Sequence, residues 1–382
     1  SIMPLTWRTS ALASRHLAIG GELEDWNGMG TAWFYDSTPE RAKADYETIR
    51  TKAGLMDVSG LKKVHLVGPD AAHVIDRVTT RAVDKIAPGK CKYASVLNSD
   101  GKFIDDCIIY HVGINSWLVV HGTGICMEQL TTVAAGKKCA VIFDDDIHDM
   151  SLQGPVAVDF LAKYIPGIRD LAYFGFITTR LFKKDVMISR TGYTGERGYE
   201  IFCSAKDAPF IWDTILSDGA DMGIGPVQFS TLDWLRVESY LLFYPGDNSE
   251  TYPFADEGCG DTIWELGLEF TVSPKKVGFI GAENHYKLKG KERFKIYGVK
   301  LEGTTPADEG AELLQDGKPV GFVTFGMWSD LNQHNVGIAR MPVAAATPGT
   351  ELTVLNKDGT EIKAIAAEMP FYDLDKSKRM AK

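Results

Sequence analysis

The chain has 382 residues, of which 45% are hydrophobic and 24% charged, and its formal net charge at neutral pH is −10. This is the composition of an ordinary globular protein, and the length is enough for two or three domains. The acidic balance argues against nucleic acid or an anionic membrane surface as the main partner. No run of residues approaches the ~18 apolar residues of a membrane span.

Helical and strand-like patterns alternate along the first two thirds of the chain. Helices are predicted at residues 39–54, after Gly68-Pro69, and at 124–135, 207–217 and 228–241. Strands are predicted at 64–67, at 116–121, and on both sides of a turn at 98–102. Gln153-Gly-Pro155 repeats the order of strand, Gly-Pro and helix, a weak sign of two related α+β halves.

The last third of the chain has a different pattern. Residues 244–260 are rich in turn-forming residues and form either a linker or a functional loop. Short strands are predicted at 297–301, 321–324, 337–339 and 351–355. This pattern is typical of a small β-barrel or sandwich.

The segment from Ser189 to Glu200 is unusually dense in glycine, with three glycines in twelve residues, and then enters an apolar strand. Glycine at this density allows a tight turn and a close approach to a ligand. A carboxylate at Glu200 could accept two parallel N–H bonds from a flat heterocycle, such as the amino-pyrimidine edge of a folate. The alternative is a glycine-rich hairpin with a solvated glutamate.

Two adjacent aspartates follow the 98–102 turn on a predicted strand. Side chains alternate along a strand, so Asp106 should share one face with Ile104, Ile108 and Tyr110, and Asp105 the other with Phe103 and Cys107. Both faces are largely apolar, so at least one carboxylate should be drawn from water and have a perturbed pKa, as at many catalytic sites. The alternative is that both aspartates only terminate the turn.

Several other classes of site are not favoured. The six cysteines contain no C-x-x-C pair and are expected to be reduced and buried, as in a cytoplasmic protein, which makes a zinc site unlikely to form. No secretory signal is evident. Residues 117–124 resemble half of a dinucleotide fingerprint, but Met127 stands where its last glycine would be.

The ordered set of motifs resembles the folate-binding T-protein (aminomethyltransferase) family of the glycine cleavage system. That family has relatives among folate-dependent demethylases, such as dimethylsulfoniopropionate demethylase. The likeness runs from about Gly21 to Tyr372 and is carried by Met56-Asp-Val-Ser59, Gly68-Pro69, Tyr93, Asn98 to Asp106, Gln153-Gly-Pro155, Ser189 to Glu200, Arg236-Val-Glu238, Tyr244 to Asp247 and Met369-Pro-Phe-Tyr372.

This resemblance implies an α+β fold, a three-domain cloverleaf with tetrahydrofolate in a central hole and a C-terminal β-barrel. The expected domains are residues 1–64 with 150–247 (a discontinuous folate-binding domain), 65–149 (an α+β domain) and 248–382 (the barrel domain).

The resemblance also assigns site residues. Asp106 matches the catalytic aspartate beside the folate nitrogens, and Glu200 matches the glutamate that holds the pterin edge. Tyr93 and Tyr193 match tyrosines that line the folate site, and Leu61 matches a position beside the reacting centre. His121, Tyr252 and Trp264 are weaker candidates for contacts to the donor. No metal is expected.

The chain departs from the T-protein pattern at several positions. Ser59 is followed by Gly60-Leu61-Lys62 instead of His-Met-Gly, and His121 stands where the family often has asparagine. Leu232 replaces an arginine, and the 244–260 loop is longer.

These departures favour a tetrahydrofolate-dependent demethylase or methyltransferase that takes a methyl group from a small methylated donor. The alternatives are an aminomethyltransferase, which would need a lipoyl carrier protein as partner, and a non-catalytic folate-binding protein. No nucleic-acid or membrane partner is expected.

Overall fold

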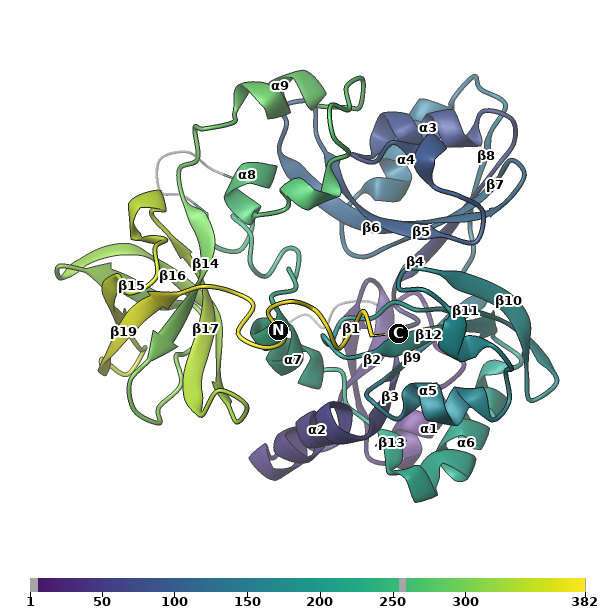
Figure 1. Cartoon of the computed structure of the whole chain (residues 1–382), viewed down its shortest axis with the longest axis horizontal. Helices are drawn as coiled ribbons and strands as arrows, with labels where there is room; N and C mark the ends of the chain where they lie inside the picture. Colours follow the sequence, from purple (N-terminus) through teal and green to yellow (C-terminus); the bar gives the residue numbers. More distant parts are fainter. Residues whose placement is uncertain (1–5, 254–258, 382) are drawn as a thin grey trace.

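The computed structural model describes residues 6–253 and 259–381. Two β-sheets and a closed barrel surround a common centre, near which α7 lies (Figure 1). This mixed α+β architecture confirms the predicted fold class and the predicted barrel. Within the described ranges, every helix is too short or too polar to cross a lipid bilayer.

The first sheet has six strands in the order β10-β11-β12-β9-β3-β13. Its strands are β3 (Ala53–Asp57), β9 (Ile147–Gln153), β10 (Phe176–Leu181), β11 (Lys184–Ser189), β12 (Gly198–Ser204) and β13 (Ile224–Pro226). Helices α5 (Ala157–Ala162) and α6 (Ala208–Gly219) contribute to the apolar core on one of its faces, as does Leu12, which immediately precedes α1 (Ala13–Ala18). A hairpin of β1 (Glu22–Trp26) and β2 (Met29–Phe34) lies beside it.

The second sheet has five strands in the order β5-β6-β7-β4-β8. They are β4 (Lys62–Val67), β5 (Cys91–Leu97), β6 (Phe103–Gly113), β7 (Ser116–His121) and β8 (Ala140–Phe143). Helices α3 (Ala71–Val78) and α4 (Cys126–Ala134) cover one face through a continuous apolar core. The other face packs against the six-stranded sheet, where Tyr110 contacts Phe176 and Phe202 edge to face.

The barrel closes in the order β14-β17-β16-β15-β18-β19. Its strands are β14 (Lys295–Leu301), β15 (Ala311–Gln315), β16 (Lys318–Ser329), β17 (His334–Met341), β18 (Glu351–Leu355) and β19 (Glu361–Ala367). Helices α8 (Ile263–Leu266) and α9 (Ala282–Lys287) lie between the barrel and the five-stranded sheet (Figure 1). Short 3-10 turns occur at Val83–Lys85, Ile168–Asp170, Ala220–Met222, Glu269–Thr271 and Val343–Ala345.

Local sequence signals explain where several elements begin. Helix α2 (Pro39–Thr51) starts with a proline, and the Thr38 side chain accepts a hydrogen bond from the Arg41 amide at 3.2 Å. Gly68 and Gly154, which end β4 and β9, have φ angles of +135° and +136°, and a side chain at either would lie 2.3 Å from a backbone oxygen. The repeated Gly-Pro motif therefore makes the same tight turn in both sheets.

The three parts of the fold meet in one apolar cluster. It joins Tyr46 of α2, Phe103 of β6, Leu235 of α7 (Thr231–Ser239), Ile263 of α8 and Ile338 of β17. Strands of the two sheets come from residues 53–226 and 62–143, and the barrel strands start at residue 295. The exact boundaries of the domains stay a prediction.

Candidate functional site

The glycine-rich segment links β11 to β12 and wraps around a buried glutamine. A side chain at Gly192 or at Gly198 would lie 2.2 Å or 1.9 Å from Oε1 of Gln153, and one at Gly195 would lie 2.0 Å from the Ser239 hydroxyl. The glycines were expected to let the backbone approach a ligand. The neighbours that require them are Gln153 and Ser239, so their immediate role is packing.

Buried ion pairs hold this segment against α2 and α7. Arg50 contacts Glu196 and Glu238 at 2.9 Å each, and Tyr46 donates to Glu238 at 2.7 Å. The hydroxyl of Tyr193 donates to the backbone oxygens of Leu241 and Leu242. The segment is therefore rigid where it reaches the centre of the molecule.

Asp106 and Tyr93 form the most distinctive pair in this region. The hydroxyl of Tyr93 on β5 donates to Oδ2 of Asp106 on β6 at 2.5 Å. Burial, followed by the negative charge of Asp105, raises the pKa of Asp106 to about 7, against the effect of the Tyr93 hydrogen bond. A carboxyl with this pKa can exchange a proton near neutral pH.

Two further tyrosines lie near the Tyr93–Asp106 pair. Tyr193 and Tyr240 are close enough to Tyr93 to affect its pKa, which burial raises well above its usual range, and Asp106 in turn raises the pKa of Tyr193. Tyr240 ends α7 with a left-handed backbone, φ 42°, and its hydroxyl donates to the Leu266 oxygen. Tyr93 and Tyr193 therefore lie near the Asp106 carboxyl, and Tyr240 lies near Tyr93. Tyr240 had no clear signal in the sequence.

Asp105 has a different environment from its neighbour. It is 1% exposed, and its carboxylate bonds to Nδ1 of His121 at 3.0 Å, to the Cys126 amide at 3.0 Å and to the Asp106 amide at 2.8 Å. It therefore fixes the start of α4 and the path of β6.

A β-bulge changes the predicted faces of this strand. The register of β5 against β6 shifts between Val96 and Leu97, so that Ile104 is skipped and packs with the helix-covered core that contains Cys107. The expectation that Ile104 shares a face with Asp106 is wrong for this reason. Ile108 and Tyr110 do lie on the face toward the six-stranded sheet.

Glu200 lies on β12, on the face of the six-stranded sheet that packs against the five-stranded sheet. It is 7% exposed, and burial raises its pKa, while Asp149, Thr191 and Lys63 lower it. The negative charge of Glu200 raises the pKa of Tyr110 on β6, so the two side chains are close. Tyr110 lies four residues from Asp106 on the same face of β6, a separation of about 13 Å at the usual strand rise. Both candidate carboxyls thus border the layer between the two sheets.

Asp149 and Lys63, both 0% exposed, were not singled out from the sequence. Lys63 donates to the backbone oxygens of Ser59 and Leu61 at 2.7 Å each, and burial lowers its pKa to about 8. The sequence had no clear signal for either residue, because Lys63 follows Lys62 in β4 and Asp149 follows His148 in β9.

The other candidates are distributed as follows. Leu61 packs against the central cluster, as Tyr93 does, and against the layer that holds Ile108 and Tyr110. His121 is 2% exposed beside Asp105, and its Nε2 has no partner among the described residues.

Tyr252 and Trp264 make packing contacts. Tyr252 stacks on Phe322 of the barrel at 5.4 Å. Trp264 stacks on His285 at 4.6 Å and donates to its backbone oxygen at 2.8 Å. A role of either residue in binding the donor stays a prediction.

The turn-rich loop contains a short buried stretch at residues 247–249. Asp247, Asn248 and Ser249 are 0% exposed, and Arg236 binds Asp247 at 2.7 Å. Residues 254–258 of the loop lie outside the described residues. Leu232, which replaces an arginine of the T-protein pattern, packs against the central cluster.

The cysteines agree with the sequence expectation only in part. All six are free, and four are buried, but Cys139 is partly exposed and Cys259 is exposed. Within the described part of the chain, no group of three or more His, Cys, Asp or Glu side chains could hold a metal ion.

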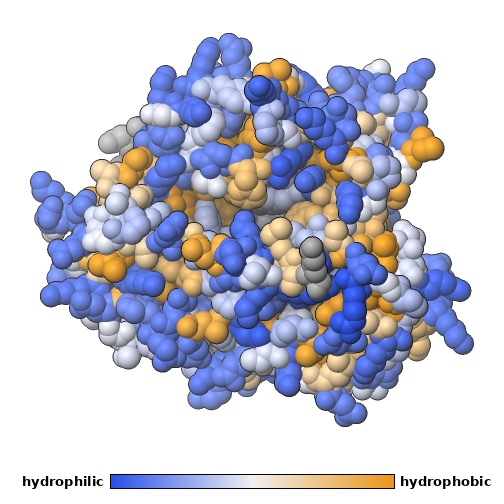
Figure 2. All heavy atoms as spheres, viewed as in Figure 1, coloured by the Kyte–Doolittle hydropathy of each residue, from blue (hydrophilic) through white to orange (hydrophobic). Residues whose placement is uncertain are grey.

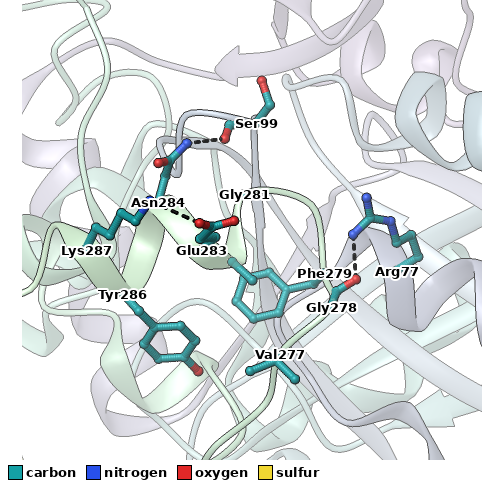
Figure 3. Close-up of a pocket in the computed structure, with 11 residues that line it drawn as sticks. Arg77, Ser99, Val277, Gly278, Phe279, Gly281, Glu283, Asn284, Tyr286 and Lys287 are labelled. Atoms are coloured by element: carbon teal, nitrogen blue, oxygen red, sulfur yellow. Dashed lines mark hydrogen bonds and ion pairs between the residues drawn. The ribbon is translucent and has the colours of Figure 1, made fainter.

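A separate cavity of about 600 Å³ lies between α3, the 98–102 turn and α9 (Figure 3). Arg77 reaches the Gly278 oxygen across its floor, and Phe279, Tyr286 and Lys287 line its wall. No predicted site residue lines it. The space-filling view shows a hollow near the middle of the molecule, bordered by both apolar and polar side chains (Figure 2).

Known families match this fold over nearly its whole length. Residues 12–276 match the GCVT N-terminal domain, and residues 295–373 match the glycine cleavage T-protein C-terminal barrel domain. The chain therefore belongs to the glycine cleavage T-protein family, as the motifs indicated.

The individual relatives are named either as an N-demethylase subunit or as aminomethyltransferases. The chain is 58% identical to the heme-dependent oxidative N-demethylase gamma subunit of Ectopseudomonas mendocina, over 100% of both chains. It is 30% identical to an aminomethyltransferase of Halothermothrix orenii, over 93% of this chain and 97% of that one. The crystal structure of aminomethyltransferase T from Bartonella henselae superposes with a TM-score of 0.85 at 25% identity, covering 96% of this chain and 98% of the other.

Proposed function

We propose that this chain is a tetrahydrofolate-dependent one-carbon transferase in which Asp106 is the catalytic residue and Glu200 holds the pterin. The observation that carries the proposal is the Tyr93–Asp106 pair, a carboxyl with a pKa of about 7 in the layer that also contains Glu200. A non-catalytic folate-binding protein would not need a carboxyl with this property.

The residues present fit a reduced folate. The amino-pyrimidine edge of a pterin presents N–H donors, and a buried carboxylate at Glu200 is a suitable acceptor for them. Tyr93 and Tyr193 offer aromatic surface near Asp106. When bound, tetrahydrofolate supplies two nitrogens that accept carbon, N5 alone or N5 and N10 together.

The role of Asp106 depends on the oxidation level of the incoming carbon. For a methyl group, the ionised carboxylate would stabilise positive charge that develops next to it. For carbon at the aldehyde or aminomethyl level, Asp106 would accept and return a proton, which its pKa near neutrality permits. Tyr93 holds the carboxylate in place for either task.

We infer that the carbon comes from a small N-methylated amine that a separate heme-dependent oxidative subunit oxidises, and that this chain receives the carbon after that oxidation, because the relative at 58% identity is the gamma subunit of a heme-dependent oxidative N-demethylase. Oxidation of an N-methyl group takes its carbon to the level of formaldehyde, and tetrahydrofolate with formaldehyde gives 5,10-methylene-tetrahydrofolate and water. Direct transfer of an unoxidised methyl group, which the sequence alone favoured, would give 5-methyl-tetrahydrofolate instead.

The free cysteines support a reducing, cytoplasmic location.

The test is to identify the product made with each class of donor. The full chain is first titrated calorimetrically with tetrahydrofolate, and then assayed with formaldehyde, with methylated amines and sulfonium compounds, and with an aminomethyl-lipoyl carrier protein. We expect rapid methylene-tetrahydrofolate formation from formaldehyde, above the uncatalysed rate and above that of Asp106→Asn. Formation of 5-methyl-tetrahydrofolate would restore the direct route. Robust release of ammonia from the lipoyl carrier would make the chain an aminomethyltransferase, and no heat of folate binding would reject the proposal.

A further inference from the structure

Two buried carboxyls lie next to each other on the face of the six-stranded sheet that borders the candidate site. Asp149 is directly opposite Phe202, and Glu200 is directly opposite Ser151, so the two acidic side chains are diagonal neighbours across β9 and β12. They are 0% and 7% exposed. Two ionised carboxylates this close, away from water, would repel each other strongly.

The carboxyl of Asp149 has no hydrogen-bond donor. Both of its oxygens are buried, and no described residue donates to either of them. An ionised carboxylate in that position would have no hydrogen bond to offset the cost of its desolvation. The side chain lies within hydrogen-bonding reach of Glu200, and two carboxyls can bond only if one of them keeps a proton.

The asymmetry between the two carboxyls indicates which one keeps it. Burial, followed by the charge of Glu200, raises the pKa of Asp149 well above its usual range. For Glu200, burial also raises the pKa, but bonds from Asp149 and Thr191 lower it. The Thr191 hydroxyl is a second donor to Glu200, whereas none of the residues that the structure describes donates to Asp149.

One cation balances one of the two carboxyls. The Lys63 ammonium uses two of its three N–H groups on backbone oxygens, and the charge of Asp149 raises its pKa against the effect of burial. With a single proton on the carboxyl pair, the three side chains are neutral in sum. The other titratable groups near them are the thiols of Cys91 and Cys203 and four outer groups, Asp57, Tyr110, Arg8 and Asp145.

These outer groups already have partners. Asp57 is paired with His16 at 2.9 Å, Arg8 with Asp145 at 2.7 Å, and Tyr110 with the Ser189 hydroxyl at 3.1 Å. They do not supply the donor that Asp149 lacks.

We propose that Asp149 is a positioning residue that carries a proton and donates it to Glu200, so that Glu200 remains an ionised and oriented acceptor for the N–H edge of a bound pterin. Only the pterin contact rests on the proposed function. The shared proton is a property of the ligand-free chain and can be tested without a folate.

The first experiment is infrared spectroscopy of the ligand-free full chain. It uses an Asp106→Asn background, because Asp106 also titrates near neutral pH. We expect a C=O band of a neutral, buried carboxyl at pH 7 that shifts when aspartate is labelled with ¹³C and disappears in Asp149→Asn. Absence of the band, its persistence in Asp149→Asn, or a shift only with labelled glutamate would overturn the proposal.

The second experiment measures the affinity for 5-formyl-tetrahydrofolate by calorimetry. Asp149→Asn keeps an N–H donor toward Glu200, and should bind within about threefold of the unmodified chain. Asp149→Leu removes the donor and should weaken binding by about tenfold or more, the usual effect of losing a hydrogen bond to a charged group. Ser151→Ala, on the same face opposite Glu200, is the matched control and should bind normally.

The two measurements separate the possible failures. Unchanged affinity in Asp149→Leu would overturn the positioning role. If the infrared result holds but no variant and not even the unmodified chain binds the folate, the proposed function and the pterin contact are wrong, and the shared proton stands.

Discussion

Each face of strand β6 carries one aspartate, and the two aspartates have opposite environments. On the helix-covered face, Asp105 bonds to His121 and to two backbone amides, and is almost completely buried. On the face toward the six-stranded sheet, Asp106 receives one side-chain bond, from Tyr93, and its pKa is raised to about 7. A carboxylate with several donors stabilises the fold, and one with few donors is poised for chemistry.

The largest effect on turnover should come from removing the charge of Asp106, on the face of β6 toward the six-stranded sheet. Asp106→Asn should lower turnover by about 10²- to 10⁴-fold, because the carboxylate is the group that stabilises charge or moves the proton. Folate affinity should change by less than about threefold, since Glu200 is unchanged. Product formation and calorimetry measure the two quantities. Near-normal turnover would show that the reactivity of Asp106 is irrelevant to the reaction.

The matched change at Asp105, on the helix-covered face of β6, should lower stability and leave the rate unchanged. Asp105→Ala leaves His121 and the amides of Cys126 and Asp106 without their acceptor, and should cost about 3 kcal/mol of unfolding free energy. Urea denaturation measures this cost, with Asp106→Asn as the control. If Asp105→Ala unfolds at the same urea concentration as the unmodified chain, the two faces do not differ as described.

Removing the Tyr93 hydroxyl should change how the rate depends on pH. The Tyr93 bond lowers the pKa of Asp106, so Tyr93→Phe should raise that pKa and move the acid side of the pH–rate profile to higher pH. Relative to the unmodified chain, the rate should be reduced most at and below neutral pH and should recover as the pH rises above the new pKa. Tyr240→Phe, whose hydroxyl bonds to Leu266, is the control. An unshifted profile in Tyr93→Phe would contradict the assigned bond.

The smallest effect should come from His121→Asn, which introduces the residue that the T-protein pattern often has. The asparagine amide can still donate to Asp105, so the loss of unfolding free energy should be about 1 kcal/mol or less. The Michaelis constant for the donor should stay within about twofold unless Nε2 of His121 binds the donor. The same urea and kinetic measurements give both values.

Much of the local structure was predictable because its signals are local. The strand at 116–121, the helix after Thr38 and the turn at Asn98 follow from apolar spacing, capping and Asx chemistry. The candidate carboxyls at Asp106 and Glu200 were also visible, because a charge inside an apolar strand is unusual. The bulge at Ile104 was not, because it depends on the register of β5 against β6.

The sequence by itself determined the order of the elements, the family and the short list of acidic residues, since each depends on neighbours along the chain or on motifs. Only the tertiary structure decided which aspartate of the 105–106 pair is satisfied, what the glycines at 192 and 198 accommodate, and that Lys63 and Asp149 meet Glu200. The protonation of a carboxyl is set by burial and by charges a few ångströms away. In this fold those charges come from strands that are distant in sequence.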